Sequence, residues 1–242
     1  MSEPSLTGKR VVLIGGTEGL GLATAHAAAT AGAQVIVVSS RPANVEKALA
    51  ELPSNAQGDT VDVREESQVK ALFERIGAFD HLVFTAGETL VLAPVMSTEL
   101  DAQKRFFDIR FWGAFASVKH AASHIRPGGS IVLSSGASSQ RPGPGWAVAS
   151  SALGAMESLC SALALELAPI RVNLVRPGMV RTDMWREFPE EAREEMFRTT
   201  GQRLPVGRIG EPSDIARSYV HLMEQEYATG SIVTVDGGGL LV

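Results

Sequence analysis

The sequence predicts a doubly wound α/β fold, built as one parallel sheet with helices on both faces. Short apolar runs rich in β-branched residues alternate with longer segments of helical periodicity, which is typical of successive βαβ units. The short runs are continuously apolar, as expected for strands that are covered on both faces. A glycine-rich turn follows the first of these runs, where such folds bind ligands.

Seven strands are expected along the chain, at residues 10–14, 34–38, 59–61, 81–85, 130–134, 171–175 and 231–235. Helices are expected between them, at residues 20–31, 44–52, 65–76, 98–125, 146–167 and 212–224. The glycines at 32, 77, 128 and 129 stand where we expect helices to end, because glycine readily adopts the left-handed conformation of a helix C-terminus.

Composition favours one globular domain that spans residues 1–242. Hydrophobic residues make up 45% of the chain and charged residues 20%, and no linker or repeat divides it. The net charge of −5 argues against a nucleic-acid partner. We expect no membrane span, since no apolar run approaches the roughly 20 residues that a bilayer requires. The start of the chain lacks a signal-peptide pattern, and the single Cys160 excludes an internal disulfide, so we expect a cytoplasmic protein.

The turn at residues 15–21 reads Gly-Gly-Thr-Glu-Gly-Leu-Gly and leads into a predicted helix. Glycines let the backbone approach a pyrophosphate, and the helix N-terminus supplies free N–H donors and partial positive charge. This position between a first strand and a first helix predicts a Rossmann-type dinucleotide site; the alternative is a tight turn without a ligand.

Further landmarks along the chain resemble the short-chain dehydrogenase/reductase superfamily, although Ile14 stands where that family usually has Thr. The segment 235–238 resembles the family's closing strand and turn. The resemblance implies a set of cofactor-binding residues in four segments: Gly15, Thr17, Glu18, Gly19 and Leu20 in the loop, Asp62 and Val63 beside adenine, Thr85, Ala86 and Gly87 after the fourth strand, and Pro177, Gly178, Val180 and Thr182 near the nicotinamide carboxamide.

The end of the second strand favours NADP(H) over NAD(H). NAD sites carry an acid about 20 residues after the glycine loop to bind the ribose 2′-hydroxyl. Here the chain has Ser39, Ser40 and Arg41, whose hydroxyls and guanidinium suit a 2′-phosphate. An ordinary polar loop is the alternative, and the acidic Glu18 counts against NADP(H), because NADP-using relatives often carry a basic residue in that part of the loop.

The family's proton chemistry depends on a Ser and a Tyr-x-x-x-Lys pair, and only the Ser is found. Ser135 closes the fifth strand in the place of the catalytic serine, or it simply caps the loop there. The family's spacing from Ser135 places the Tyr at Val148 and the Lys at Ala152, so both side chains are missing. The only tyrosines, Tyr219 and Tyr227, are distant in sequence.

Arg110 stands where the family has a catalytic Asn, in the long helix after the fourth strand. We hypothesise that it supplies the positive charge that Ala152 cannot, by holding the nicotinamide ribose or an anionic group of the substrate. The alternative is a surface ion pair with Asp108 or Glu99. Arginine cannot replace Tyr as proton donor, because its pKa is too high.

The sequence therefore predicts an NADP(H)-binding oxidoreductase with an atypical site, which transfers hydride to a small carbonyl or imine-type substrate. The alternatives are an inactive NADP(H)-binding sensor or partner subunit, and a non-redox enzyme on the same fold. His120 and His124 could pair on one helix face, but no metal site is expected. The resemblance implies a homodimer or homotetramer, and a variable substrate lid at about residues 183–210.

Overall fold

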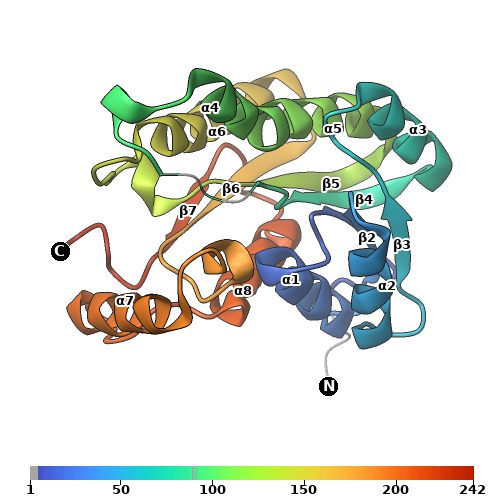
Figure 1. Ribbon diagram of the computed structural model, residues 1–242. Coiled ribbons are helices and arrows are strands. Elements are labelled where there is room, and N and C mark those ends of the chain that lie inside the picture. The colour runs from blue at the N-terminus through green and yellow to red at the C-terminus, as the bar shows by residue number, and fades with distance from the viewer. Residues whose placement is uncertain (1–4, 89, 91) are drawn as a thin grey trace.

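The computed structural model describes residues 5–88, 90 and 92–242 (Figure 1). Its centre is one seven-stranded sheet of order β3-β2-β1-β4-β5-β6-β7, in which every neighbouring pair is parallel. The predicted doubly wound fold is thereby confirmed. The strands are β1 (Arg10–Ile14), β2 (Gln34–Ser39), β3 (Gln57–Thr60), β4 (Phe79–Phe84), β5 (Ile125–Ser134), β6 (Arg171–Pro177) and β7 (Ile232–Val235).

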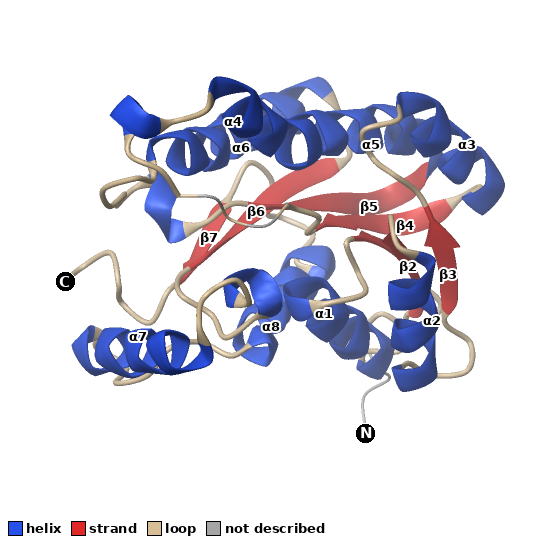
Figure 2. Ribbon diagram, in the orientation of Figure 1, coloured by secondary structure: helices blue, strands red, loops and turns tan. Residues whose placement is uncertain are grey.

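Helices cover both faces of the sheet (Figure 2). On one face lie α3 (Glu66–Ile76), α4 (Leu100–Phe107), α5 (Ala114–Ala121) and α6 (Ala147–Glu166), and on the other lie α1 (Gly19–Thr30), α2 (Pro42–Glu51) and α8 (Pro212–Glu224). Successive side chains of a strand point to opposite faces, so β1 sends Val12 and Ile14 into one core and Val11 and Leu13 into the other. This division explains why central strands such as β1, β2 and β4 are apolar on both faces, whereas β3 at the edge is polar.

The helix expected at 98–125 is present over residues 100–124, but it is not one uniform α-helix. A π-helical turn, η2 (Asp108–Gly113), separates α4 from α5, and β5 already begins at Ile125. At Gly113 a Cβ would lie 2.6 Å from Val63 Cγ2, so the turn brings the backbone close to the loop after β3. Such turns often occur at functional sites.

Gly128 and Gly129 do not end a helix, as the sequence suggested, but lie inside β5. Gly128 has φ +83°, and the pairing register between β4 and β5 shifts at this end of the strands. The left-handed glycine therefore serves a bulge in the sheet. A further helix, α7 (Glu190–Arg203), occupies the segment that the sequence assigned to a substrate lid.

The premise that no apolar run approaches the length of a membrane span needs correction. Among the described residues, α6 is long and apolar enough to do so by length and composition alone. Its side chains Met156, Cys160 and Leu163 instead pack into the core on the sheet. Burial against the sheet accounts for the apolar character of this helix.

Candidate cofactor and active site

A cleft of about 720 Å³ opens at the carboxyl ends of the strands. Every residue that the sequence suggested for the site lines it, so the fold brings them together, while their individual roles stay predictions. They are Gly15, Thr17, Glu18, Gly19, Leu20, Ser39, Ser40, Arg41, Asp62, Val63, Thr85, Ala86, Gly87, Arg110, Ser135, Pro177, Gly178, Val180 and Thr182.

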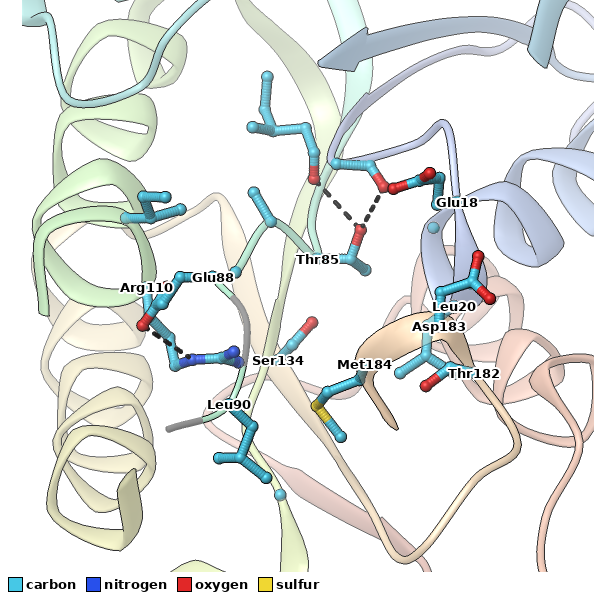
Figure 3. Close-up of a pocket in the computed structure, with 18 of the residues that line it drawn as sticks. Glu18, Leu20, Thr85, Glu88, Leu90, Arg110, Ser134, Thr182, Asp183 and Met184 are labelled. Carbon is cyan, nitrogen blue, oxygen red and sulfur yellow. Dashed lines mark hydrogen bonds and ion pairs between the residues drawn. The ribbon is translucent and has the colours of Figure 1, made fainter. Parts of the chain in front are cut away.

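The glycine loop is pressed against the end of β4. Gly15 has φ +83°, and a Cβ there would lie 2.5 Å from the Ala86 amide nitrogen. At Gly21 a Cβ would lie 2.0 Å from the Gly15 carbonyl oxygen. The Thr85 hydroxyl lies 3.2 Å from both the Ile14 and Gly15 carbonyl oxygens and holds the loop in place (Figure 3).

This loop fits a dinucleotide pyrophosphate. The loop passes close to neighbouring backbone at Gly15 and Gly21, and a side chain at either position would collide with that backbone. The N-cap of α1, Glu18, makes no side-chain capping hydrogen bond in the described structure. The first N–H groups of α1 therefore lack a side-chain cap and are available to donate hydrogen bonds to an anion.

The end of the cleft beside β2 and β3 carries two cationic side chains. Arg41 follows Ser39, whose Oγ accepts a hydrogen bond of 3.3 Å from the Arg41 N–H. Arg64, which the sequence reasoning did not select, lines the same end and donates to Asp62 through Nε at 2.9 Å. This hydrogen bond is the main reason that the pKa of Asp62 lies below its ordinary value. The signal for Arg64 was its place directly after the Asp62-Val63 landmark.

The segment after β6 forms the opposite wall. Figure 3 shows Thr182, Asp183 and Met184 across the pocket from Glu88 and Arg110. Gly178 allows this segment to pass close to the end of β7, since a Cβ there would lie 2.6 Å from Asp236 Cα. The cleft is thus bounded by several segments that are distant in sequence.

The Ser135 hydroxyl points into a buried polar network. Its Oγ lies 3.0 Å from the Leu153 carbonyl oxygen and 2.9 Å from Glu157 Oε1, and its single proton can be donated to either. Since a serine that orients a substrate carbonyl must donate its proton to it, Ser135 would first have to release these acceptors. Both acceptors lie on α6, so the contacts tie Ser135 to that helix, and its catalytic and loop-capping roles both stay predictions.

Glu157 is the centre of that network and was not anticipated from the sequence. It accepts hydrogen bonds from Arg176 Nε at 2.8 Å and Nη2 at 2.7 Å, and from Ser139 Oγ at 2.5 Å and Gln140 Nε2 at 3.1 Å. Burial by itself would raise the pKa of Glu157, but these hydrogen bonds outweigh it and lower the pKa below its ordinary value. The network fastens α6 to the ends of β5 and β6.

Neither Val148 nor Ala152, the positions that the family spacing gives for Tyr and Lys, lines the cleft. Leu153 lines it instead. At Gly136 a Cβ would lie 3.2 Å from Leu153 Cδ1, while Ala152 is buried beside Phe106. A shift of one residue on a helix rotates a side chain by about 100°, which the family spacing alone did not resolve.

Tyr219 lies nearer the site than its sequence position suggested. Ser134, which lines the cleft, donates to the Phe84 carbonyl oxygen at 2.6 Å, which leaves the Tyr219 hydroxyl as the donor to Ser134 Oγ at 2.6 Å. Tyr219 is fully buried, and burial raises its pKa to about 12, against the opposing effect of the Ser134 hydrogen bond. Its proton is therefore directed at Ser134 Oγ in the core and does not face the cleft.

His120 does not join a metal site in the described part of the chain, where no cluster of three metal-ligating side chains occurs. Its Nε2 lies 2.9 Å from Glu66 Oε1, and Lys119 Nζ lies 2.7 Å from the same oxygen. Glu66 therefore joins α3 to α5 at the surface.

Arg110 projects from η2 into the cleft, where its side chain is 15% exposed. Its Nε lies 3.9 Å from Glu88 Oε1, and its Cζ lies 5.1 Å from the centre of the Phe106 ring. The predicted alternative of a surface ion pair with Asp108 or Glu99 is therefore wrong: the partner is Glu88, and the pair lies in the cleft (Figure 3).

Glu88 is the functional candidate that the sequence reasoning missed. Its side chain is 17% exposed, and both carboxyl oxygens are buried without a hydrogen-bond partner among the described residues. Burial raises the pKa of Glu88 to about 7, against the opposing attraction of Arg110. The only signal in the sequence was its place directly after Thr85-Ala86-Gly87.

Comparison with known proteins covers the whole fold. Residues 15–239 match the family model described as Enoyl-(Acyl carrier protein) reductase. The chain is 35% identical to the short-chain dehydrogenase/reductase ATR9 of Stachybotrys chlorohalonatus, over 98% of this chain and 99% of that protein. It is 30% identical to the short-chain dehydrogenase/reductase malC of Malbranchea aurantiaca, over 99% and 97%.

Solved structures agree with these sequence matches. The structure of the MalC Reductase/Diels-Alderase from Malbranchea aurantiaca superposes with a TM-score of 0.92 at 29% identity and covers 100% of both chains. A small-chain dehydrogenase in complex with NADPH superposes with a TM-score of 0.85 at 34% identity, over 97% of this chain and 99% of that chain. With its glycine loop, its sheet order and its full-length matches, the chain belongs to the short-chain dehydrogenase/reductase family of oxidoreductases.

Proposed function

We propose that the chain binds NADP(H) and reduces a small carbonyl or imine-type substrate. The observation that carries the proposal is one continuous cleft with a backbone-lined anion cradle and Arg41 towards one end and the Glu88–Arg110 pair towards the other. The similar dehydrogenase that was solved with NADPH supports the choice of cofactor.

In this proposal the residues divide by the part of the cofactor that they hold. The glycine loop and the N-terminus of α1 bind the pyrophosphate. Ser39, Ser40 and Arg41 bind the 2′-phosphate of the adenosine, and Arg64 adds positive charge beside them. The segment 177–182 holds the nicotinamide. The bound cofactor supplies the hydride that the substrate carbon accepts.

Dinucleotide binding is tested by fluorescence titration of the purified protein with NADPH and NADH. We expect NADPH to bind more tightly than NADH. Arg41→Ala should weaken NADPH binding by about 10- to 100-fold and change NADH binding little, since a charged hydrogen bond contributes roughly 1.5–3 kcal/mol. Arg203→Ala, an exposed arginine outside the cleft, is the matched control. If neither dinucleotide binds, the cofactor assignment fails.

Arg110 is proposed to hold the nicotinamide ribose or an anionic group of the substrate. Its side chain is largely buried, so its loss removes a desolvated charge that solvent cannot replace. We expect Arg110→Ala to weaken the binding of cofactor or substrate about tenfold or more, equivalent to roughly 1.4 kcal/mol. Arg105→Ala on the exposed face of α4 is the control. Unchanged affinity for both cofactor and substrate would rule out this role.

Two other functions stay open because no Tyr of this chain presents its hydroxyl to the cleft. One is an inactive NADP(H)-binding sensor or partner subunit. The other is non-redox chemistry, and it is supported by the similarity to MalC, which is described as a Reductase/Diels-Alderase. A panel of carbonyl and imine substrates separates them: binding without cofactor consumption indicates a sensor, and product without net oxidation indicates non-redox chemistry.

We also propose a homodimer or homotetramer in the cytoplasm. Trp112, Phe115 and Leu165 are 58%, 42% and 84% exposed on η2, α5 and α6, an apolar set that a second copy could cover. Cys160 is a buried free thiol, which agrees with a reducing compartment. Analytical ultracentrifugation tests the assembly, and a monomer at micromolar concentration would contradict it.

A further inference from the structure

We propose that Glu88 is the proton donor of this site, in the place of the tyrosine that the chain lacks. The proposal rests on the reductase function proposed above and deepens it. Glu88 lines the same cleft as the glycine loop and Arg110, and it directly follows the Thr85-Ala86-Gly87 segment at the end of β4. It follows β4, which β1 separates in the sheet from β2 and β3, the strands that precede Arg41 and Asp62.

The surroundings of the Glu88 carboxyl group suit proton transfer. It is largely withdrawn from solvent, and neither oxygen is bound by a described residue. Arg110 Nε stands at 3.9 Å, too far for a hydrogen bond but close enough to stabilise the carboxylate that forms after proton transfer. Such a carboxyl group can be protonated before the reaction and ionised after it at neutral pH.

The other groups of the cleft are less suited to this task. The Ser135 proton is directed at Leu153 and Glu157, and the Tyr219 proton at Ser134. Arg110 cannot give up a proton at neutral pH. Asp108, on η2, is the other acid whose charge acts on Glu88, and it opposes ionisation there. Of these groups, Glu88 is the one whose oxygens are buried without a hydrogen-bond partner among the described residues.

The chemistry balances as a ketone reduction. The carbonyl carbon gains a hydride from NADPH, and the carbonyl π electrons move to the oxygen. That oxygen takes the Glu88 proton, so the carboxyl O–H bond breaks as the O–H bond of the alcohol forms. The products are the alcohol, NADP⁺ and a Glu88 carboxylate beside Arg110, which solvent reprotonates.

A pair of substrates isolates the proton step. A ketone oxygen must gain a proton, whereas an N,N-dialkyl iminium ion becomes a neutral amine on hydride addition and needs none. We expect Glu88→Gln to lower kcat/KM for the ketone by about 10²- to 10⁴-fold. The kcat/KM for the iminium ion should stay within about threefold of the wild-type value. Glu99→Gln, an exposed acid outside the cleft, is the matched control. Equal losses on both substrates would overturn the proposal.

The pH profile provides a second readout. A proton donor must be protonated, and the pKa of Glu88 stands at about 7 through burial. We therefore expect kcat/KM for the ketone to fall as pH rises above about 7, and the fall to be absent in Glu88→Gln. Arg110→Met removes the positive charge that lowers the pKa of Glu88, so that pKa should rise. The decrease of kcat/KM should then occur at higher pH. A wild-type profile without this fall, or one that survives in Glu88→Gln, would contradict the role.

A measurement without cofactor or turnover separates this proposal from the proposed function. Infrared spectra of the unliganded protein between pH 5 and pH 9 should show a protonated-carboxyl band that disappears with a midpoint near the pKa of about 7 and is missing in Glu88→Gln. If NADPH fails to bind but the band titrates, the reductase proposal fails while Glu88 retains its proton. If the band is absent at pH 6, the Glu88 proposal fails whatever the cofactor does.

Discussion

Replacing Arg176 with methionine should lower the free energy of unfolding by about 3–5 kcal/mol, because it leaves the Glu157 carboxylate buried without its cation. The two side chains are only 13% and 10% exposed and are joined at 2.8 and 2.7 Å. Denaturant unfolding followed by circular dichroism measures the effect. Arg176→Met with Glu157→Gln should cost less than Arg176→Met alone, since no buried charge then lacks a partner.

Arg198→Met is the matched control for this prediction. Arg198 forms an equally close ion pair with Glu195, at 2.6 Å, but both side chains are more than half exposed. An exposed pair contributes about 0–1 kcal/mol, because water screens it. Equal destabilisation by Arg176→Met and Arg198→Met would show that burial of the Glu157 pair is not what matters.

The same pair gives the protein an acid-sensitive stability. Folding lowers the pKa of Glu157, so its contribution is present above the unfolded value of about 4.5 and is lost as pH falls through the lower folded value. Wild type should therefore lose stability faster than Glu157→Gln as pH falls below about 4.5. Parallel losses in the two proteins would contradict this origin of the pH dependence.

Gly21→Ala should weaken NADPH binding by about 10- to 100-fold, or roughly 1.4–2.7 kcal/mol. Its Cβ would lie 2.0 Å from the Gly15 carbonyl oxygen, so the loop must move away from the start of α1. That movement disrupts the cradle of N–H groups and should cost a further 1–3 kcal/mol or so of stability. Fluorescence titration and thermal unfolding measure the two effects.

Gly154→Ala provides the control, because Gly154 is also helical but no atom lies within 4 Å of its Cβ position. There alanine should stabilise the helix by about 0.5–1 kcal/mol and leave NADPH binding unchanged. The two glycines thus separate helix propensity from close packing. If Gly21→Ala binds NADPH like wild type, the loop does not form the cradle.

Local patterns in the sequence predicted the framework of the fold well. The bounds of β1 and α8 match the prediction, since β1 is a continuous apolar run and α8 is an amphipathic helix that begins at a proline. The resemblance to the short-chain dehydrogenase/reductase family identified most of the cleft residues, which lie in the glycine loop and at strand ends. The π turn at Asp108–Gly113 was missed, because it depends on close approach to Val63, which no local pattern records.

The chemistry at the reacting end was harder to predict, because it depends on contacts between distant segments. Glu88 looks like any polar loop residue until the fold places it beside Arg110, and Tyr219 looks remote until its hydroxyl reaches Ser134 from the other face of the sheet. Leu153 took the place expected for Ala152 through a rotation of one residue on α6. In each case the direction of the side chain decided the outcome.

Gly87 couples the end of β4 to the helix that carries Arg110. A Cβ at Gly87 would lie 2.3 Å from Arg110 Nη2, so the guanidinium occupies space that this residue leaves empty. Substitutions at 87 and 110 are therefore epistatic: alanine at 87 would displace the arginine without removing its charge, yet would find free space once a short side chain stood at 110. A lineage moving between the family's Asn and this Arg would keep the guanidinium in its present position only with glycine at 87, which favours some orders of substitution over others.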